Sequence, residues 1–163
     1  MQIRSERPAD ADAIHRVTAA AFAGVPYSDQ TEPAIVDALR ADEVLTVSLV
    51  AVDGDEIIGH VAFSPVEIGE VARGWYGLGP VSVSPERQRQ GIGQALVRQG
   101  LEALKAMEAA GCVVLGDPAY YGRFGFESDP AIRYGAEVSP YLQRLVFHGP
   151  SPTGAVRYHP SFG

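Results

Sequence analysis

The segment from Leu78 to Leu115 constrains the fold more than any other part of this 163-residue chain. Leu78–Val83 reads as a strand, Ile92–Met107 repeats apolar residues at helical spacing, and Cys112–Leu115 is typical of a short buried strand. A strand, a helix and a second strand in this order form a βαβ unit, whose strands run parallel. Part of the sheet is therefore predicted to be parallel, with Gly111 ending the helix.

Two helices and a hairpin are predicted before this segment. A short strand is predicted at Ile3, followed by a first helix whose apolar residues recur at helical spacing and whose N-cap is Asp10 or Asp12. A second helix is predicted to begin at Thr31-Glu32-Pro33. From Val44 the apolar period changes to two, and Asp53-Gly54 is typical of a hairpin turn before the return strand. The apolar positions behind these assignments are Ile14, Val17, Ala21, Phe22, Ile35, Val36, Leu39, Leu45, Val47, Leu49 and Ala51, with the return strand at Ile57–Phe63.

The remaining segments carry weaker patterns. Gly69–Gly74 is predicted to be a polar loop, and the chain beyond Phe126 is rich in Pro, Gly and Tyr, which predicts short strands separated by turns. Pro80 lies inside a predicted strand, where the missing N–H usually marks a bulge or a break in pairing. The prediction for the whole chain is one α/β domain over residues 1–163, with strands of mixed direction.

Composition excludes several classes of protein. The net charge of −7 argues against nucleic-acid binding, which relies on clustered Lys and Arg, and is compatible with a cationic acceptor. The longest apolar stretch, Val44–Val52, is too short to span a bilayer, so no membrane role is predicted. The N-terminus shows no basic segment followed by an apolar run, and the single Cys112 suits a reducing compartment, so a cytoplasmic location is predicted. The four histidines lack metal-binding spacing, so no metal is predicted.

The loop between the strand and the long helix carries the strongest functional signal. Gly91 and Gly93 let the backbone turn closely at the helix start, where free N–H groups and the helix dipole favour an anion such as a pyrophosphate. The polar run Arg87-Gln88-Arg89-Gln90 adds charge and hydrogen-bond donors. A dinucleotide-binding fingerprint fails because Leu96 stands where a third Gly or Ala belongs, and no Gly-Lys-Ser or Gly-Lys-Thr of a P-loop occurs.

Gln88-Arg89-Gln90-Gly91-Ile92-Gly93 resembles the Gln/Arg-x-x-Gly-x-Gly/Ala motif of the GNAT superfamily of N-acetyltransferases, and it follows a Val-x-Val strand that ends in Ser-Pro. The segments Leu78–Pro85, Gly116–Phe126 and Gly154–Phe162 resemble more narrowly the acetyltransferases of the YhbS type. The resemblance implies the GNAT fold, a mixed and mostly antiparallel central sheet with a splayed parallel pair, flanked by helices. It also implies acetyl-CoA as cosubstrate and an amine of a small molecule or a protein as acceptor.

The resemblance assigns cofactor contacts mainly to the backbone. The strand at Val81, Ser82 and Val83 is expected to pair its main chain with the pantetheine arm, beside a bulge near Pro80. The amides of the following loop are expected to wrap the pyrophosphate; the residues concerned are Arg89, Gln90, Gly91, Ile92, Gly93 and Gln94.

Catalysis is assigned to a tyrosine by the same resemblance. The general acid of the family lies four residues before the Gly-Phe pair, which is Tyr121 here, with Tyr120 as the competing candidate. The usual Asn-x-x-Ala before that tyrosine is replaced by Gly116-Asp117-Pro118, which predicts a short helix. Acetyl transfer to an amine also needs a base or a water relay, because an alkylamine is mostly protonated near neutral pH.

The sequence offers several candidates for the base and for the acceptor pocket. Glu67, Glu70 and His60 lie near the expected strands without identifying the base, and Tyr27 and Glu32 are candidates for the acceptor pocket by family analogy. The alternative to an enzyme is an acyl-CoA-binding sensor or partner domain that has lost turnover. The acceptor and the oligomeric state, a homodimer included, are not determined.

Overall fold

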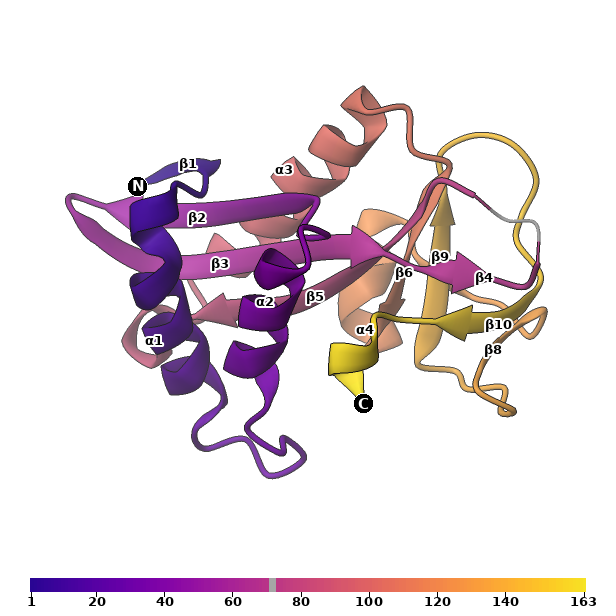
Figure 1. Cartoon of the computed structure of the whole chain (residues 1–163), viewed down its shortest axis with the longest axis horizontal. Coiled ribbons are helices and arrows are strands. Elements are labelled where there is room, and N and C mark those ends of the chain that lie inside the picture. The colour runs from indigo at the N-terminus through magenta and orange to yellow at the C-terminus, as the bar shows by residue number, and fades with distance from the viewer. Residues whose placement is uncertain (71–72) are drawn as a thin grey trace. The chain divides into compact units, whose positions relative to one another are not determined.

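Three long elements each contribute residues to both of the two units into which the chain divides. They are β3 (Glu56–Pro65), β5 (Trp75–Val83) and α3 (Ile92–Ala106) (Figure 1). The computed structural model describes residues 1–70 and 73–163. The first unit comprises Met1–Phe63, Gly79–Gly100 and Ser161–Gly163, and the second comprises Ser64–Leu78 and Leu101–Pro160.

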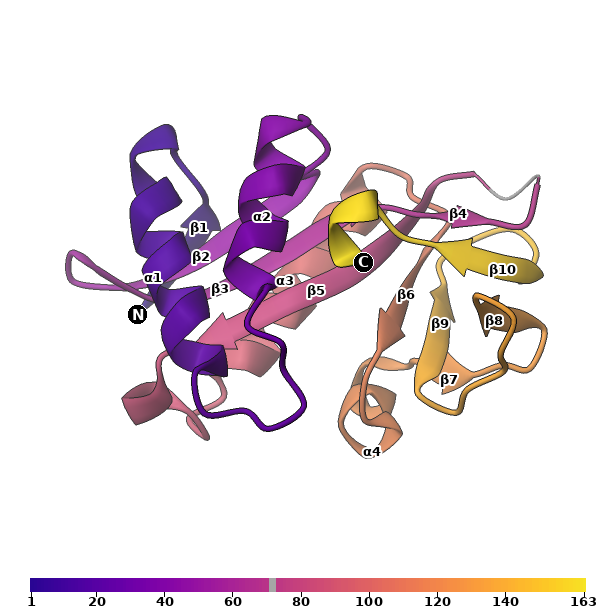
Figure 2. The same cartoon turned by 60° about the horizontal axis from the view of Figure 1, so that its bottom comes forward.

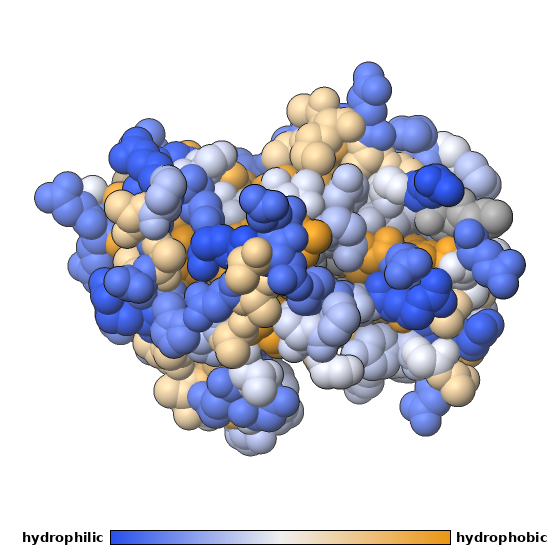
Figure 3. Space-filling model, viewed as in Figure 1, coloured by the Kyte–Doolittle hydropathy of each residue, from blue (hydrophilic) through white to orange (hydrophobic). Residues whose placement is uncertain are grey.

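The first unit is a sheet covered by helices on both faces. Its other elements are β1 (Gln2–Ser5), η1 (Pro8–Asp10), α1 (Ala11–Phe22), α2 (Glu32–Ala41), β2 (Val47–Asp53) and η2 (Pro85–Arg87). Strands β1, β2 and β3 pair antiparallel, with Gln2 opposite Val52 and Val47 opposite Phe63. Helices α1 and α2 lie on one face and the start of α3 on the other (Figures 1 and 2), and the exposed sides of α1 and α2 are mostly hydrophilic (Figure 3).

The predicted helices and hairpin of this unit are confirmed. The apolar stripes of α1 and α2 meet the sheet in a cluster that contains Ile14, Val36 and Val50. The cap predicted for α1 is wrong in one respect, because the Asp10 side chain makes no capping bond to that helix. Its carboxylate instead accepts from the backbone N–H of Arg7 at 2.7 Å and pairs with Arg4 at 2.7 Å, which stabilises the turn before α1.

The second unit contains the parallel pair of strands. Its other elements are β4 (Glu67–Ile68), β6 (Gly111–Leu115), α4 (Pro118–Tyr121), η3 (Gly122–Phe124), β7 (Glu127–Ser128), β8 (Ile132–Tyr134), β9 (Leu142–Val146) and β10 (Gly154–Arg157), and the chain ends in η4 (Pro160–Phe162). β5 runs parallel to β6, with Trp75 opposite Gly111, and β6 runs antiparallel to β9. The mixed α/β sheet and the short strands beyond Phe126 are confirmed. Of the polar loop predicted over Gly69–Gly74, residues 71 and 72 lie outside the described residues.

The irregularity predicted at Pro80 is present in β5. Near one end of the pairing with β3, the N–H of Val66 donates to the carbonyl of Trp75, and near the other the N–H of Ser84 donates to the carbonyl of Ile58. Between these two hydrogen bonds the chain advances nine residues from Trp75 to Ser84 but only eight from Ile58 to Val66. The β5 side therefore carries one extra residue, as in a β-bulge. The backbone departs from a regular strand at the cis bond between Gly79 and Pro80, where Gly79 has a φ of 136°.

The helix stop predicted at Gly111 is wrong. Helix α3 ends at Ala106, and Glu108 takes the left-handed conformation with a φ of 63°. The N–H of Ala109 donates to the carbonyl of Leu104 and that of Glu108 to Lys105, which is the Schellman pattern. Gly111 has a packing role instead, because an added Cβ would lie 2.4 Å from the Trp75 ring.

Two glycines let α3 lie close against β3 in the first unit. A Cβ on Gly100 of the helix would lie 2.1 Å from the ring of Phe63, which is fully buried. A Cβ on Gly59 of the strand would lie 3.1 Å from the Leu96 side chain and 3.2 Å from that of Ile92. Small residues at these positions therefore set how closely the helix approaches the sheet.

We expect Gly100→Ala to lower the free energy of unfolding by about 1–3 kcal/mol, because the added methyl overpacks the Phe63 ring. Urea denaturation measures the change. Gly24→Ala is the control, since its Cβ would meet no atom within 4 Å. Equal stabilities of the two variants would contradict a close packing of α3 on β3.

Candidate functional site

The loop that joins β5 to α3 is held by two of the polar side chains that precede the glycines. The Arg87 guanidinium pairs with the Asp53 carboxylate at 2.9 Å, and the Gln88 amide donates to the Val83 carbonyl at 3.1 Å. These contacts contradict the expectation that the whole run from Arg87 to Gln90 offers its donors to a ligand. The side chains of Arg89 and Gln90 are exposed and make no hydrogen bond or ion pair with the described residues.

The backbone of the same loop turns sharply before the helix. Arg89 and Gly91 both have left-handed conformations, with φ of 65° and 82°. Helix α3 begins at Ile92, and the N–H of Ala95 donates to the carbonyl of Gly91 at 3.1 Å. The N–H groups of the preceding helical residues have no carbonyl one turn earlier inside the helix, and they lie at the positive end of the helix dipole. This geometry suits an anionic group.

The last residues of β5 offer main-chain atoms more than side chains. Ser82 is 1% exposed, and its hydroxyl has no hydrogen-bond partner among the described residues. Val81 and Val83 are half-buried and alternate with it along the strand. A ligand beside this strand end would therefore contact mainly its peptide groups.

Tyr121 lies at the end of α4 in the second unit, and the short helix predicted there is confirmed. Asp117 caps that helix, because its carboxylate accepts from the backbone N–H of Ala119 at 2.9 Å. The Tyr121 ring occupies the space beside Gly116, where an added Cβ would lie 2.4 Å from it. The Gly116-Asp117-Pro118 sequence thus builds the turn that positions this ring.

The rings around Tyr121 form an aromatic cluster. Its ring centroid is 5.0 Å from that of Tyr120, 6.1 Å from Phe124 and 6.0 Å from Phe126. The Arg123 guanidinium lies 4.5 Å from the centre of the Tyr120 ring.

The candidate base His60 lies in the core of the first unit. It is fully buried, and its Nε2 lies 2.8 Å from the Ser48 hydroxyl, which itself donates to the Glu6 carboxylate. Nε2 therefore carries the hydrogen, and Nδ1 has no partner among the described residues. Arg40 of α2 completes the network by two hydrogen bonds to Glu6, at 2.8 and 3.0 Å.

Two groups of this network have lowered pKa values, each for a different reason. Burial lowers the pKa of His60 to about 4, so the ring is neutral at physiological pH. Burial would raise the pKa of Glu6, but the hydrogen bonds from Arg40 and Ser48 lower it below its ordinary value. The network joins the residue that follows β1 to β2, β3 and α2, which indicates a structural role for His60.

The other residues named from the sequence are placed less tightly. Glu67 is exposed and pairs with Arg157 at 3.4 Å, and Glu70 is exposed. Tyr27 is 90% exposed, and Glu32 accepts a hydrogen bond from Ser28 at 2.7 Å. The described residues contain no group of three or more potential ligands arranged to hold a metal ion. Within residues 1–70 and 73–163, no helix is long and apolar enough to cross a bilayer.

Sequence reasoning missed the partner of Arg87, although it singled out the arginine. Asp53 belongs to the hairpin turn and lies far from Arg87 along the chain. Its role as a turn residue gave no signal that its carboxylate also anchors the loop.

The fold and the loop together define an acyltransferase of the GNAT type, and comparison with known proteins agrees. Residues 12–126 match the model of the acetyltransferase (GNAT) family, to which this chain belongs. Over 169 aligned residues it is 38% identical to a protein described as an uncharacterized N-acetyltransferase, YhbS of Escherichia coli K12, and the alignment covers 99% of this chain and 98% of the relative.

Two solved structures are similar over nearly the whole chain. A GNAT family acetyltransferase from Brucella melitensis in complex with acetyl-CoA is 52% identical, with a TM-score of 0.89 and coverage of 99% and 97%. YhbS of Escherichia coli in complex with CoA is 36% identical, with a TM-score of 0.87 and coverage of 99% and 91%. The predicted GNAT resemblance and the α/β fold class are confirmed.

We expect His60→Gln to reduce the loss of stability that accompanies acidification from pH 6.5 to 4. In this window the unfolded chain takes up a proton on His60 that the folded protein does not, so folding stability falls as the pH falls, by on the order of 3 kcal/mol in total. Urea denaturation across the window measures the slope, with exposed His148→Gln as the control. If the free energy of unfolding of His60→Gln falls with pH as steeply as that of the unchanged protein, the His60 ring is not held neutral in the folded state.

Proposed function

We propose that this protein transfers the acetyl group of acetyl-CoA to an amine, as one GNAT domain over residues 1–163. The observation that carries the proposal is the start of α3, where unpaired amides follow the left-handed turn at Gly91 and the Arg89 side chain is not engaged by the described residues. Family membership supports it, as do the relatives described in complex with acetyl-CoA and with CoA.

The proposed cofactor site divides into two backbone surfaces. The main chain of Val81, Ser82 and Val83 pairs with the pantetheine arm, as a strand would. The pyrophosphate is bound by the amides at the start of α3, and Arg89 adds a positive charge; the residues concerned are Arg89, Gln90, Gly91, Ile92, Gly93 and Gln94. Both surfaces lie in the first unit, which supports their acting together.

We expect Gly91→Ala to weaken acetyl-CoA binding by about tenfold. Alanine disfavours the left-handed backbone by about 1–2 kcal/mol, so the free loop relaxes and its amides leave the position that the pyrophosphate needs. Isothermal titration calorimetry measures the dissociation constant.

Gly135→Ala is the matched control for this change. Gly135 also has a left-handed φ, of 63°, and no atom within 4 Å of an added Cβ, but it belongs to a loop of the second unit. If both variants bind acetyl-CoA as well as the unchanged protein does, the loop is not the pyrophosphate site.

The proposed reaction is a direct transfer. The neutral amine nitrogen attacks the thioester carbonyl, the new C–N bond forms, and the C–S bond breaks to release the CoA thiolate. Tyr121 gives its phenolic proton to that thiolate and regains one from solvent, while the proton of the attacking amine leaves to water. The aromatic cluster and the close fit at Gly116 support a fixed ring position for this step.

We expect Tyr121→Phe to lower kcat by about a hundredfold while acetyl-CoA affinity is retained, because only the proton donor is lost. Thiol release in the presence of a panel of amines measures turnover, and calorimetry measures binding. Tyr120→Phe is the control, since its ring also belongs to the aromatic cluster. Unchanged turnover in Tyr121→Phe would remove this residue from the mechanism.

The acceptor is proposed to be an amine of a small molecule or a protein, met in the cytoplasm. The acidic net charge and the free, buried Cys112 support these assignments. The same thiol-release assay separates an enzyme from a sensor domain. Binding of acetyl-CoA without amine-stimulated release would favour the sensor.

A further inference from the structure

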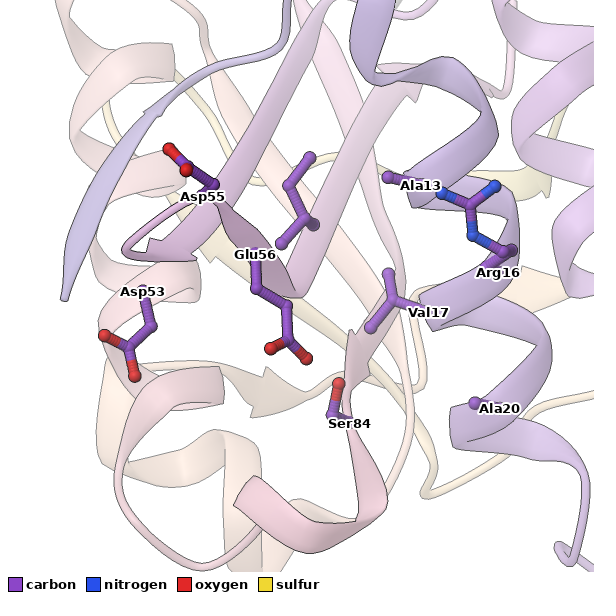
Figure 4. Close-up of a pocket in the computed structure, with 9 residues that line it drawn as sticks. Ala13, Arg16, Val17, Ala20, Asp53, Asp55, Glu56 and Ser84 are labelled. Carbon is purple, nitrogen blue, oxygen red and sulfur yellow. The ribbon is translucent and has the colours of Figure 1, made fainter.

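The first unit contains a cavity of about 640 Å³ between α1 and the hairpin that joins β2 to β3 (Figure 4). One stripe of α1, with Ala13, Arg16, Val17 and Ala20 at helical spacing, forms one wall. The hairpin forms the opposite wall, and Ser84, which directly follows β5, lies between them (Figure 4). Its volume is within the range of small-molecule sites.

Opposite charges line the two walls without neutralising each other. Figure 4 shows the Arg16 guanidinium on the α1 side and the Glu56 carboxylate on the hairpin side. Neither group forms an ion pair or hydrogen bond within the part of the chain that the structure describes. Asp53, also in the lining, is already paired with Arg87. Among the described residues of the lining, Arg16 is therefore a cation without a partner, and Glu56 and Asp55 are carboxylates without a partner.

The hydroxyl of Ser84 is a further, uncharged polar group in this cavity. The residue is 8% exposed and stands at the N-cap of η2, yet its side chain makes no capping bond. Its backbone is fully engaged, with the N–H donating to Ile58 and the carbonyl accepting from Arg87. The hydroxyl has no partner among the described residues and points toward the side of the cavity where Glu56 lies (Figure 4). This hydroxyl is therefore available to donate to, or accept from, a group bound in the cavity.

We propose that this cavity binds a small aliphatic zwitterion whose ammonium and carboxylate groups are separated, of which an aliphatic dipeptide is the simplest example. The carboxylate pairs with Arg16, and the ammonium donates to Glu56 and to the Ser84 hydroxyl. The small apolar side chains of Ala13, Val17 and Ala20 contact the aliphatic part. A phosphate would be repelled by the hairpin carboxylates, and a simple cation would leave Arg16 without a partner.

The test is a calorimetric titration of the full chain, without acetyl-CoA, with four probes: alanyl-leucine, free leucine, leucinamide and N-acetyl-leucine. We expect alanyl-leucine to bind and the two singly charged probes to bind about tenfold more weakly or not at all, since each lacks one ion pair. Free leucine binding as tightly as alanyl-leucine would overturn the requirement for separated charges. Equal binding of the singly charged probes would overturn the zwitterion site.

The matching variants locate the site. Arg16→Gln and Glu56→Gln each weaken alanyl-leucine binding by about tenfold, and Ser84→Ala weakens it by about fivefold. The controls are Arg133→Gln and Glu137→Gln, which make the same charge changes at exposed positions of the second unit. We expect both to bind alanyl-leucine as tightly as the unchanged protein does. No binding of alanyl-leucine, or equal binding by all five variants, would overturn the proposal. Because acetyl-CoA is absent from the titration, its failure would not bear on acetyl transfer.

Discussion

The close approach of α3 to β3 is the constraint on which the cofactor loop depends. Phe63 fills the space that a side chain at residue 100 would need, and Leu96 and Ile92 fill the space beside Gly59. The first turn of α3 is therefore held against the strand by contacts at several points along the helix. The direction in which its free amides point is set by packing in the core, because an exposed loop alone could not maintain it.

The loop before the helix is held by a different kind of contact. The pair between Arg87 and Asp53 and the bond from Gln88 to the Val83 carbonyl stabilise the chain on the strand side of the turn. Arg89 and Gln90 follow at once and make no such contacts with the described residues. The polar run thus has two halves, one used for structure and one available to a ligand. Adjacent residues of the same chemical type differ in role because only some have a partner within reach.

Local patterns were sufficient for much of the fold. The strand, loop and helix from Leu78 to Met107 were predictable, because hydrophobic period and glycine placement act within a few residues. The failures share one physical cause, which is competition from another part of the backbone or from a distant residue. The Asp10 carboxylate binds Arg4 and the backbone N–H of Arg7 and does not cap the helix that follows. The left-handed residue that ends α3 is Glu108, whereas the sequence predicted Gly111. Asp53, predicted as a turn residue, also anchors the loop.

The site for the acetyl donor was easier to predict than the site for the amine that accepts the acetyl group, because the two sites rely on different features of the chain. Binding through peptide groups requires glycines and a helix start, which leave a motif in the sequence. Recognition of an amine requires side chains brought together from separate elements. The candidates Tyr27 and Glu32 illustrate this, since the first is exposed and the second is bonded to Ser28. The charges of Arg16 and Glu56 lie on a helix and a hairpin that are distant in sequence and come together only in the folded chain, so no local sequence pattern marks such a site.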